Sequence, residues 1–287
     1  MNKVKDYFLL IKFTLSFMVV FSTVVCYLLA PNVGFDWKQV LLLFAGGMLL
    51  TGSSNAINQV FEKNTDAMMK RTAKRPVASG RMSVTEASAF AVIAGVSGAF
   101  IMWYYFNLES ALLGLLSLFI YGFIYTPLKK VNSIAVLVGA FPGALPCLIG
   151  WVAGFYNEPI QWTGGLILFA IQFLWQFPHF WAIAWVAHGD YTRAGFRLLP
   201  SEKGPTKFTA LQTVMYSALM IPVGVLPYYY NISGIVSMWI ILGCNLVMLY
   251  LSIMLFIKMD VKRARMVMFG SYFYLMIVLL SLYANKV

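Results

Sequence analysis

Nine apolar segments, each long enough to cross a membrane as a helix, restrict the fold of this chain more than any other feature. They lie at about residues 8–30, 39–61, 86–106, 110–128, 133–155, 161–187, 209–230, 232–257 and 266–284. A transmembrane helix needs roughly 20 predominantly apolar residues. Only 11% of the residues are charged, whereas a soluble domain carries about 25%. The sequence therefore predicts an all-α, polytopic membrane protein with nine transmembrane helices, folded as one domain over residues 1–287.

The distribution of positive charge predicts the topology. If the N-terminus is cytoplasmic, nineteen of the 21 Lys and Arg residues fall on the cytoplasmic side, and only Lys38 and Lys286 fall outside. Positive residues accumulate on the cytoplasmic side of membrane proteins. We therefore expect a multi-pass protein of the cell (inner) membrane, with two long cytoplasmic connections at about 62–85 and 188–208. The net charge of +11 then reflects topology and contact with anionic membrane lipid, and no nucleic-acid partner is expected.

Three oxygen-bearing side chains recur at four-residue steps where the second span ends: Asn58, Glu62 and Asp66. Steps of four keep side chains on one face of a helix over two turns. Such a face suits Mg²⁺, which takes one or two carboxylates together with phosphate oxygens and water. For Asp66 alone, a solvated carboxylate at a helix end explains the residue equally well. The register of all three predicts a metal site.

Cations accompany this motif. Lys70, Arg71 and Arg75 follow it directly, and Lys129 and Lys130 end the fourth predicted span on the same side of the membrane. Carboxylates that hold a metal beside a group of cations can together bind a diphosphate. The two halves of the pattern therefore predict a site for a metal–diphosphate complex.

A second polar group lies on the sixth predicted span. Gln172, Gln176 and His179 fall within about 60° of each other on a helical wheel, and Asp190 would join them if the helix continued. Arg193 follows in the same connection. His179 is a candidate ligand or catalytic residue, and a histidine that is hydrogen-bonded inside the bundle explains it equally well.

These residues resemble the UbiA superfamily of intramembrane prenyltransferases over essentially the whole chain. That family carries an Asn-x3-Asp-x3-Asp type motif after its second helix, a Tyr-Thr…Leu-Lys type segment after its fourth and an Asp-bearing loop after its sixth. Within the superfamily, three stretches look like the haem-modifying branch. They are Asn58–Asp66 with its continuation to Pro76, Phe177–Trp181, and Asp190-Tyr191 with its continuation to Pro200.

The chain departs from the wider family at two positions. Glu62 stands where many members carry Asp, which keeps the charge and lengthens the reach. Ala194 stands four residues after Asp190, where quinone-pathway members carry a further Asp. The second departure puts a second metal site in question and favours the haem branch.

The resemblance implies nine helices around a central cavity and transfer of a farnesyl group from farnesyl diphosphate to a vinyl group of haem b, with Mg²⁺ as the cofactor. It also implies roles for individual residues: Asn58, Glu62 and Asp66 as metal ligands; these three and Asp190 as catalytic residues; Lys70, Arg71, Arg75, Lys129, Lys130 and Arg193 as diphosphate-binding residues; and His179 and Gln176 as haem-binding residues. A haem-modifying or oxidase-assembly protein is a candidate partner.

Two alternatives remain open. The first keeps the chemistry and changes the acceptor to an aromatic acid of a quinone pathway. The second is a transporter that uses the polar faces of the second and sixth spans as an ion path. Transporters more often place their charges near the bilayer midplane, whereas the carboxylates and cations here gather at one surface.

Overall fold

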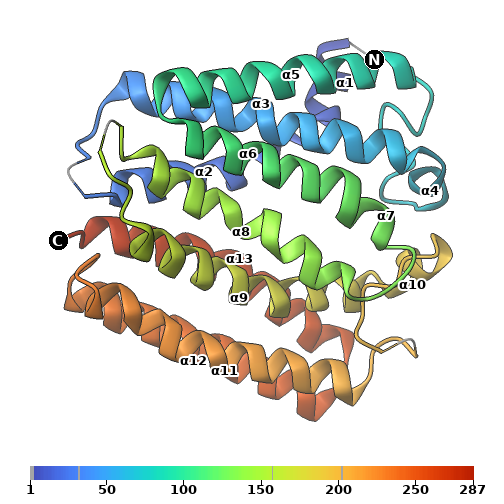
Figure 1. Cartoon of the computed structure of the whole chain (residues 1–287). Helices are drawn as coiled ribbons and strands as arrows, with labels where there is room; N and C mark the ends of the chain where they lie inside the picture. The colour runs from blue at the N-terminus through green and yellow to red at the C-terminus, as the bar shows by residue number, and fades with distance from the viewer. Residues whose placement is uncertain (1–2, 32, 157, 202) are drawn as a thin grey trace.

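The computed structural model describes residues 3–31, 33–156, 158–201 and 203–287, and its backbone is mostly helical. Figure 1 labels the helices in chain order. Their bounds are α1 Lys3–Leu10, α2 Phe13–Leu29, α3 Trp37–Phe61, α4 Lys63–Met68, α5 Val84–Tyr105, α6 Leu108–Phe119, the π-helix η1 Ile120–Tyr125, α7 Thr126–Leu128, α8 Ala135–Ala153, α9 Trp162–Val186, α10 His188–Arg193, α11 Lys207–Tyr229, α12 Ile235–Lys258 and α13 Val261–Ala284.

Within the described residues, eight helical segments are long and apolar enough to cross a membrane, and α1 with α2 forms a ninth, bent span. The helical, polytopic prediction is confirmed. The predicted start of the last span, at residue 266, is wrong by five residues because α13 begins at Val261. Asp260 accepts a hydrogen bond from the backbone N–H of Arg263 at 2.7 Å and caps this helix. Basic residues in its first turns lower the local hydropathy and hide the true start.

The first span is broken, which its hydropathy did not predict. A bend of 51° separates α1 from α2, and two polar side chains of α3 stabilise it. The Gln59 amide donates to the carbonyl oxygens of Leu9 and Leu10 at 2.9 and 3.0 Å, and the Asn55 amide donates to that of Ile11 at 3.1 Å. Because these side chains take up carbonyls that a continuous helix would use, α1 ends inside the protein.

The long helices lie side by side, and α8 and α9 are the most deeply buried of the spans. Close approach of backbones makes this possible. At Gly150 of α8, an added Cβ would collide with the carbonyl group of Thr23 on α2, so only glycine fits there. Most buried residues of the main hydrophobic core come from α2, α8, α9 and α13, and α3, α11 and α12 contribute fewer.

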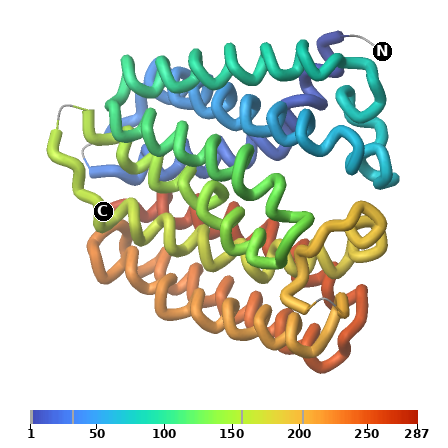
Figure 2. The backbone as a smooth tube through the Cα atoms, turned by 45° about the vertical axis from the view of Figure 1, so that its right-hand side comes forward, coloured from blue at the N-terminus to red at the C-terminus, as the bar shows by residue number. Residues whose placement is uncertain are grey.

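The short helices gather at one end of the bundle. Figures 1 and 2 show α4 and α10 at the same end as the N-terminus, with the C-terminus at the opposite end. Helix α4 and helix α10 occupy parts of the two connections predicted at 62–85 and 188–208. The connections that carry the predicted site residues are therefore neighbours in space.

Candidate active site

The predicted metal ligands lie at the junction of α3 and α4. Asn58 is in the last turn of α3, Glu62 joins the two helices, and Asp66 is in α4. The single continuous helix that we expected is interrupted at Glu62, whose φ and ψ are −95° and 9°. The four-residue register nevertheless survives. The backbone N–H of Glu62 donates to the Asn58 carbonyl at 2.9 Å, and that of Asp66 donates to the Glu62 carbonyl at 2.7 Å.

Both carboxylates are buried and paired with cations. Glu62 is 4% exposed and Asp66 0% exposed. Glu62 forms an ion pair with Lys129, which is itself buried. Nη1 of Arg75 donates to both carboxylate oxygens of Asp66, at 2.8 and 2.7 Å. Removing a buried charge from such a pair destabilises a protein by about 3–5 kcal/mol, so these side chains are held firmly.

Asn58 is held between two elements. Its amide N–H donates to the hydroxyl oxygen of Thr126 at 3.2 Å, and its Oδ1 accepts from Nζ of Lys12 at 2.8 Å. The charge pattern of the sequence places Lys12 among the cytoplasmic charges and does not predict its contact with Asn58. A lysine inside a predicted apolar span was the available signal, because such a charge is costly unless it has a partner.

The π-helix η1 places Thr126 and Lys129. Its wider turn lets the Thr126 hydroxyl donate to the carbonyl of Tyr121, five residues earlier, at 2.8 Å. The ammonium group of Lys129 lies 4.8 Å from the ring centre of Tyr125 and 5.2 Å from that of Phe196. π-Helical turns inside longer helices occur frequently at functional sites. Here the turn aims a hydroxyl and a cation at the junction of α3 and α4.

The two long connections contact each other. Arg71 donates to the hydroxyl of Tyr191 at 3.5 Å, and its guanidinium carbon lies 5.9 Å from the centre of that ring. Met69 of the first connection packs with Ala194 and Phe196 of the second. Lys70 and Lys130 are exposed on this surface. The structure thus brings the predicted cations of both connections to one end of the bundle.

The residues of the second predicted polar group, Gln172, Gln176, His179 and Asp190, do not form one site in the structure. Gln172 and Gln176 donate to the α8 carbonyls of Gly143 and Ala140 at 2.8 and 3.0 Å. They therefore serve as bridges between α8 and α9.

His179 and Asp190 have separate surroundings. Nδ1 of His179 lies 2.8 Å from the hydroxyl of Ser271 on α13. The imidazole ring of His179 stacks on the ring of Trp175, with 4.7 Å between ring centres. Asp190 lies on α10, where it accepts from Arg193 at 3.2 Å. Because α9 ends at Val186, the helix that would have aligned Asp190 with Gln176 does not continue.

The donor set suits a divalent cation that prefers oxygen. Among the residues that the structure describes, no three His, Cys, Asp or Glu side chains are grouped to hold a metal. The site offers two carboxylates and the amide oxygen of Asn58, and Mg²⁺ commonly takes one or two carboxylates and completes its shell with water and phosphate. Oxygens of a bound diphosphate would supply the remaining ligands.

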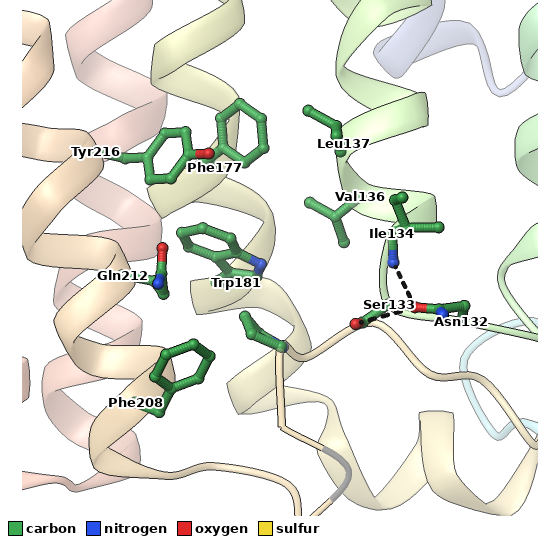
Figure 3. A pocket seen from close by; sticks show the side chains of 11 residues that line it. Asn132, Ser133, Ile134, Val136, Leu137, Phe177, Trp181, Phe208, Gln212 and Tyr216 are labelled. Carbon is green, nitrogen blue, oxygen red and sulfur yellow. Dashed lines mark hydrogen bonds between the residues drawn. The ribbon is translucent and has the colours of Figure 1, made fainter.

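A separate groove of about 260 Å³ opens between α8, α9 and α11. Figure 3 shows Phe177 and Trp181 of α9 facing Tyr216 and Gln212 of α11, with Val136 on the other side. None of the predicted site residues lines it. Phe177 and Tyr216, whose ring centres lie 4.2 Å apart, both line this groove.

Known proteins resemble this chain in sequence, and solved structures share its fold. The model of the UbiA prenyltransferase family matches residues 19–278. A protein from Cytophaga hutchinsonii named protoheme IX farnesyltransferase is 44% identical over 286 residues, which cover 100% of this chain and 99% of that protein.

Among solved structures, a digeranylgeranylglyceryl phosphate synthase superposes with a TM-score of 0.82 at 22% identity, covering 99% of both chains. A UbiA homologue from Archaeoglobus fulgidus, solved with DMAPP and Mg²⁺ bound, superposes with a TM-score of 0.69 at 14% identity. It matches 95% of this chain and 99% of its own. The family match over most of the sequence, together with this shared fold, shows that the chain belongs to the UbiA prenyltransferase family.

Proposed function

We propose that this chain transfers the farnesyl group of farnesyl diphosphate to a vinyl group of haem b, giving haem O. The observation that carries the proposal is the junction of α3 and α4, where Asn58, Glu62 and Asp66 lie in register, each in contact with a cation. The haem acceptor is supported by the name of the relative that is 44% identical. The reaction belongs to the transfer chemistry of the family.

Mg²⁺ is the metal that we propose for this site. Asn58, Glu62 and Asp66 would hold it, because hard oxygen ligands at this spacing suit its coordination. When bound, the ion supplies positive charge that stabilises the diphosphate as a leaving group. The residues of one helix junction would thus hold the proposed cofactor.

The cations of the chain assist the same step. The bond between C1 of the farnesyl group and the diphosphate oxygen breaks, and the electron pair leaves with the diphosphate. Arg75 and Lys129, which pair with the carboxylates, are placed to donate to the oxygens that gain charge. Four exposed cations of the connecting segments would attract the anionic substrate to this end of the bundle. They are Lys70, Arg71, Lys130 and Arg193.

The acceptor completes the balance of atoms. One vinyl carbon of haem b forms the new C–C bond with the farnesyl group, and a water molecule adds its hydroxyl to the other vinyl carbon and releases a proton. The rings of Tyr125 and Phe196 beside Lys129 limit the access of other water to the allylic carbon. Both the farnesyl chain and the porphyrin are apolar enough to enter from the bilayer, which suits an enzyme of the inner membrane. The distribution of Lys and Arg supports an orientation in which this site faces the cytoplasm.

His179 is the residue that we propose for contact with haem. Ser271 holds its Nδ1, which leaves Nε2 as the nitrogen for iron, in the manner of histidine ligands that are oriented through their other nitrogen. Gln176, one turn earlier on α9, would contact the porphyrin edge.

The decisive experiment is an assay of the purified protein in nanodiscs with haem b, farnesyl diphosphate and Mg²⁺. We expect a haem product that is heavier by one farnesyl group and one hydroxyl, detected by mass spectrometry, and release of pyrophosphate. Turnover of 4-hydroxybenzoate without modification of haem would reassign the acceptor. Uptake of a labelled solute into liposomes that is insensitive to Glu62→Ala would instead support the transporter alternative.

A further inference from the structure

The groove between α8, α9 and α11 has a buried floor and an exposed rim. Phe177 and Trp181 of α9 form the floor and are buried, whereas Ile134 and Phe208 at the rim are 49% and 52% exposed. Large apolar side chains that are this exposed, at the ends of membrane-spanning helices, face lipid. The groove therefore opens toward the bilayer.

The groove begins at the end of the bundle that holds the candidate active site and continues into the spans. Asn132 lines one end, just before α8, and Phe177 and Tyr216 line the other. Phe177 lies nine residues before the last residue of α9, and Tyr216 nine residues after the first residue of α11. Nine residues of helix rise by roughly 14 Å, and one leaflet with its interface is about 20–22 Å thick. The groove therefore stays within the leaflet on the side of the candidate site.

Two hydrogen-bond donors line this apolar space without a partner. The indole N–H of Trp181 and the side-chain amide of Gln212 form no hydrogen bond with any residue that the structure describes. Figure 3 shows the indole nitrogen on the side of the ring toward Val136. A buried tryptophan usually finds a hydrogen-bond partner, and a polar group inside the membrane is costly without one. A ligand with acceptor oxygens would satisfy both donors.

These donors lie at the depth where a phospholipid carries its ester groups. Trp181 is five residues before the last residue of α9, and Gln212 is five residues after the first residue of α11. Both therefore lie roughly 7–8 Å from the helix ends, and the polar interface of a bilayer is roughly 5–8 Å deep. The ester groups of a phospholipid join its headgroup to its chains at the inner border of that interface. A phospholipid thus presents its acceptor oxygens where the groove presents its donors.

The segments that supply the outer end of the groove are cationic. Residues 129–137 and 197–216 carry one acidic residue, Glu202, and five cations: Lys129, Lys130, Arg197, Lys203 and Lys207. Lys129 is paired with Glu62, whereas Lys207, next to the rim residue Phe208, is exposed. Lysine and arginine at a membrane surface attract anionic lipids. The charge therefore favours an anionic headgroup over a zwitterionic one.

We propose that this groove binds one anionic phospholipid of the leaflet on the side of the candidate site. One acyl chain lies against Phe177 and Tyr216, the ester oxygens accept from Trp181 and Gln212, and the phosphate lies beside Lys207. A prenyl diphosphate is also an anionic amphiphile, but it has no ester carbonyl between its chain and its phosphates. None of the residues proposed for prenyl transfer lines the groove, so the inference does not depend on the proposed function.

The test uses the quenching of tryptophan fluorescence by lipids with brominated acyl chains. The purified full chain is placed in phosphatidylcholine nanodiscs that contain a small fraction of brominated phosphatidylglycerol or of brominated phosphatidylcholine. Because the chain has 8 Trp, the signal of Trp181 is taken as the difference between the wild type and Trp181→Phe. We expect brominated phosphatidylglycerol to quench this signal at a fraction about fivefold lower than brominated phosphatidylcholine, as for one surface lysine and an anionic lipid.

Further variants assign the effect to the groove, each compared with its own Trp181→Phe partner. Lys207→Gln should lose most of the preference for phosphatidylglycerol. Lys258→Gln, which removes an exposed lysine of α12 that does not line the groove, is the matched control and should keep the preference. Gln212→Leu removes the amide and should weaken quenching by both lipids. Melting temperatures of all variants show whether they are folded.

A lipid variant tests the ester contacts without any change to the groove. Brominated diether phosphatidylglycerol has the same headgroup charge but no ester carbonyls. In the wild type, we expect it to quench the Trp181 signal several-fold more weakly than the ester lipid, because Trp181 and Gln212 lose their acceptors.

Four results would overturn the inference. Equal quenching of the Trp181 signal by the two headgroups would show that the groove holds bulk lipid only. Equal quenching by the ester and diether lipids would remove the ester contacts. Recovery of the signal on addition of farnesyl diphosphate, but not of pyrophosphate, would assign the groove to the prenyl donor. A Trp181 signal that no brominated lipid quenches would show that protein, such as a second copy of the chain, covers the groove.

Discussion

Glu62 and Asp66 are charged side chains with almost no exposed surface, and their surroundings explain how this is tolerated. A buried carboxylate is stable only with a well-placed partner and further hydrogen bonds. Nη1 of Arg75 donates to both carboxylate oxygens of Asp66. Thr72 donates to the backbone carbonyl of Asp66 at 2.9 Å and so holds the backbone of this residue in place. Glu62 and Lys129 pair across two spans. Pairs of this kind keep charged groups at the place where we propose that a metal ion binds.

Asp66→Asn keeps the size of the side chain and removes its charge. We expect turnover of farnesyl diphosphate to fall by at least about 100-fold, because the metal loses a carboxylate ligand. The protein should still insert and elute as a folded species, which size-exclusion chromatography checks. Asp260→Asn, at an exposed helix cap, is the control. Near-normal turnover in Asp66→Asn would remove this residue from the metal site.

His179 offers a spectroscopic test. If Nε2 binds iron, addition of haem b to the wild type should shift its Soret band, and His179→Gln should abolish that shift. His188→Gln, which changes the only other histidine of the chain, should retain it. Identical spectra for the wild type and His179→Gln would leave His179 with its structural contacts to Ser271 and Trp175 alone.

At the level of single elements, irregular backbone places the site. The break between α1 and α2, the interruption at Glu62 and the π-helix η1 all lie at the end of the bundle where Asn58 is found. If these segments were regular α-helix, the side chains that follow each irregularity would point in other directions and would not meet. In two of these cases a polar side chain stabilises the irregular turn: Gln59 does so for the end of α1 and Thr126 for η1.

Insertion of one alanine after Ile124 should change the register of the residues that follow η1. One extra residue adds about 100° of rotation, which would turn Thr126 and Lys129 away from Asn58 and Glu62. We expect turnover to fall by at least about 100-fold, as for loss of an electrostatic group, while the protein remains in the membrane fraction. Ile124→Ala keeps the chain length and should retain activity. Equal activity of the insertion variant and the wild type would show that the register set by η1 has no role in positioning.

For the whole molecule, the arrangement of the ends supports an odd number of crossings. The N-terminus and the connections that carry the site lie at one end, and the C-terminus lies at the other. At that second end, Lys286 donates to the carbonyls of Leu28 and Ala30 at 2.8 and 2.7 Å, and so joins the end of the chain to the end of α2. The first and last spans are thereby connected by hydrogen bonds at this end of the bundle.

Topology can be measured with a matched pair of variants, Lys74→Cys and Lys38→Cys, both at exposed positions. A membrane-impermeant maleimide should label Lys38→Cys in spheroplasts and Lys74→Cys only in inverted vesicles. Background labelling should be low, because Cys26 and Cys147 are buried and Cys244 is half-buried within α12. The reverse pattern would contradict the charge-based orientation.

Much of the fold and part of the site follow from local patterns. Span length and the placement of Lys and Arg depend only on the thickness and charge of the membrane, so the helical architecture could be predicted from neighbouring residues. The register of Asn58, Glu62 and Asp66 is likewise local, and the family prediction made from it is confirmed by the match over residues 19–278. The roles of the individual residues remain predictions.

The partners of these residues depend on the tertiary structure. Lys129 meets Glu62, and Lys12 meets Asn58, across separations of 67 and 46 residues along the chain. No periodicity encodes such pairings, because they depend on how a bend and a π turn rotate one helix against another. The charge pattern places Lys12 on the cytoplasmic side. Only the packing of α1 against α3 directs its side chain toward Asn58. Apolar spans can be recognised singly, but a buried charge finds its partner only when the helices are assembled, since its stability there depends on that partner.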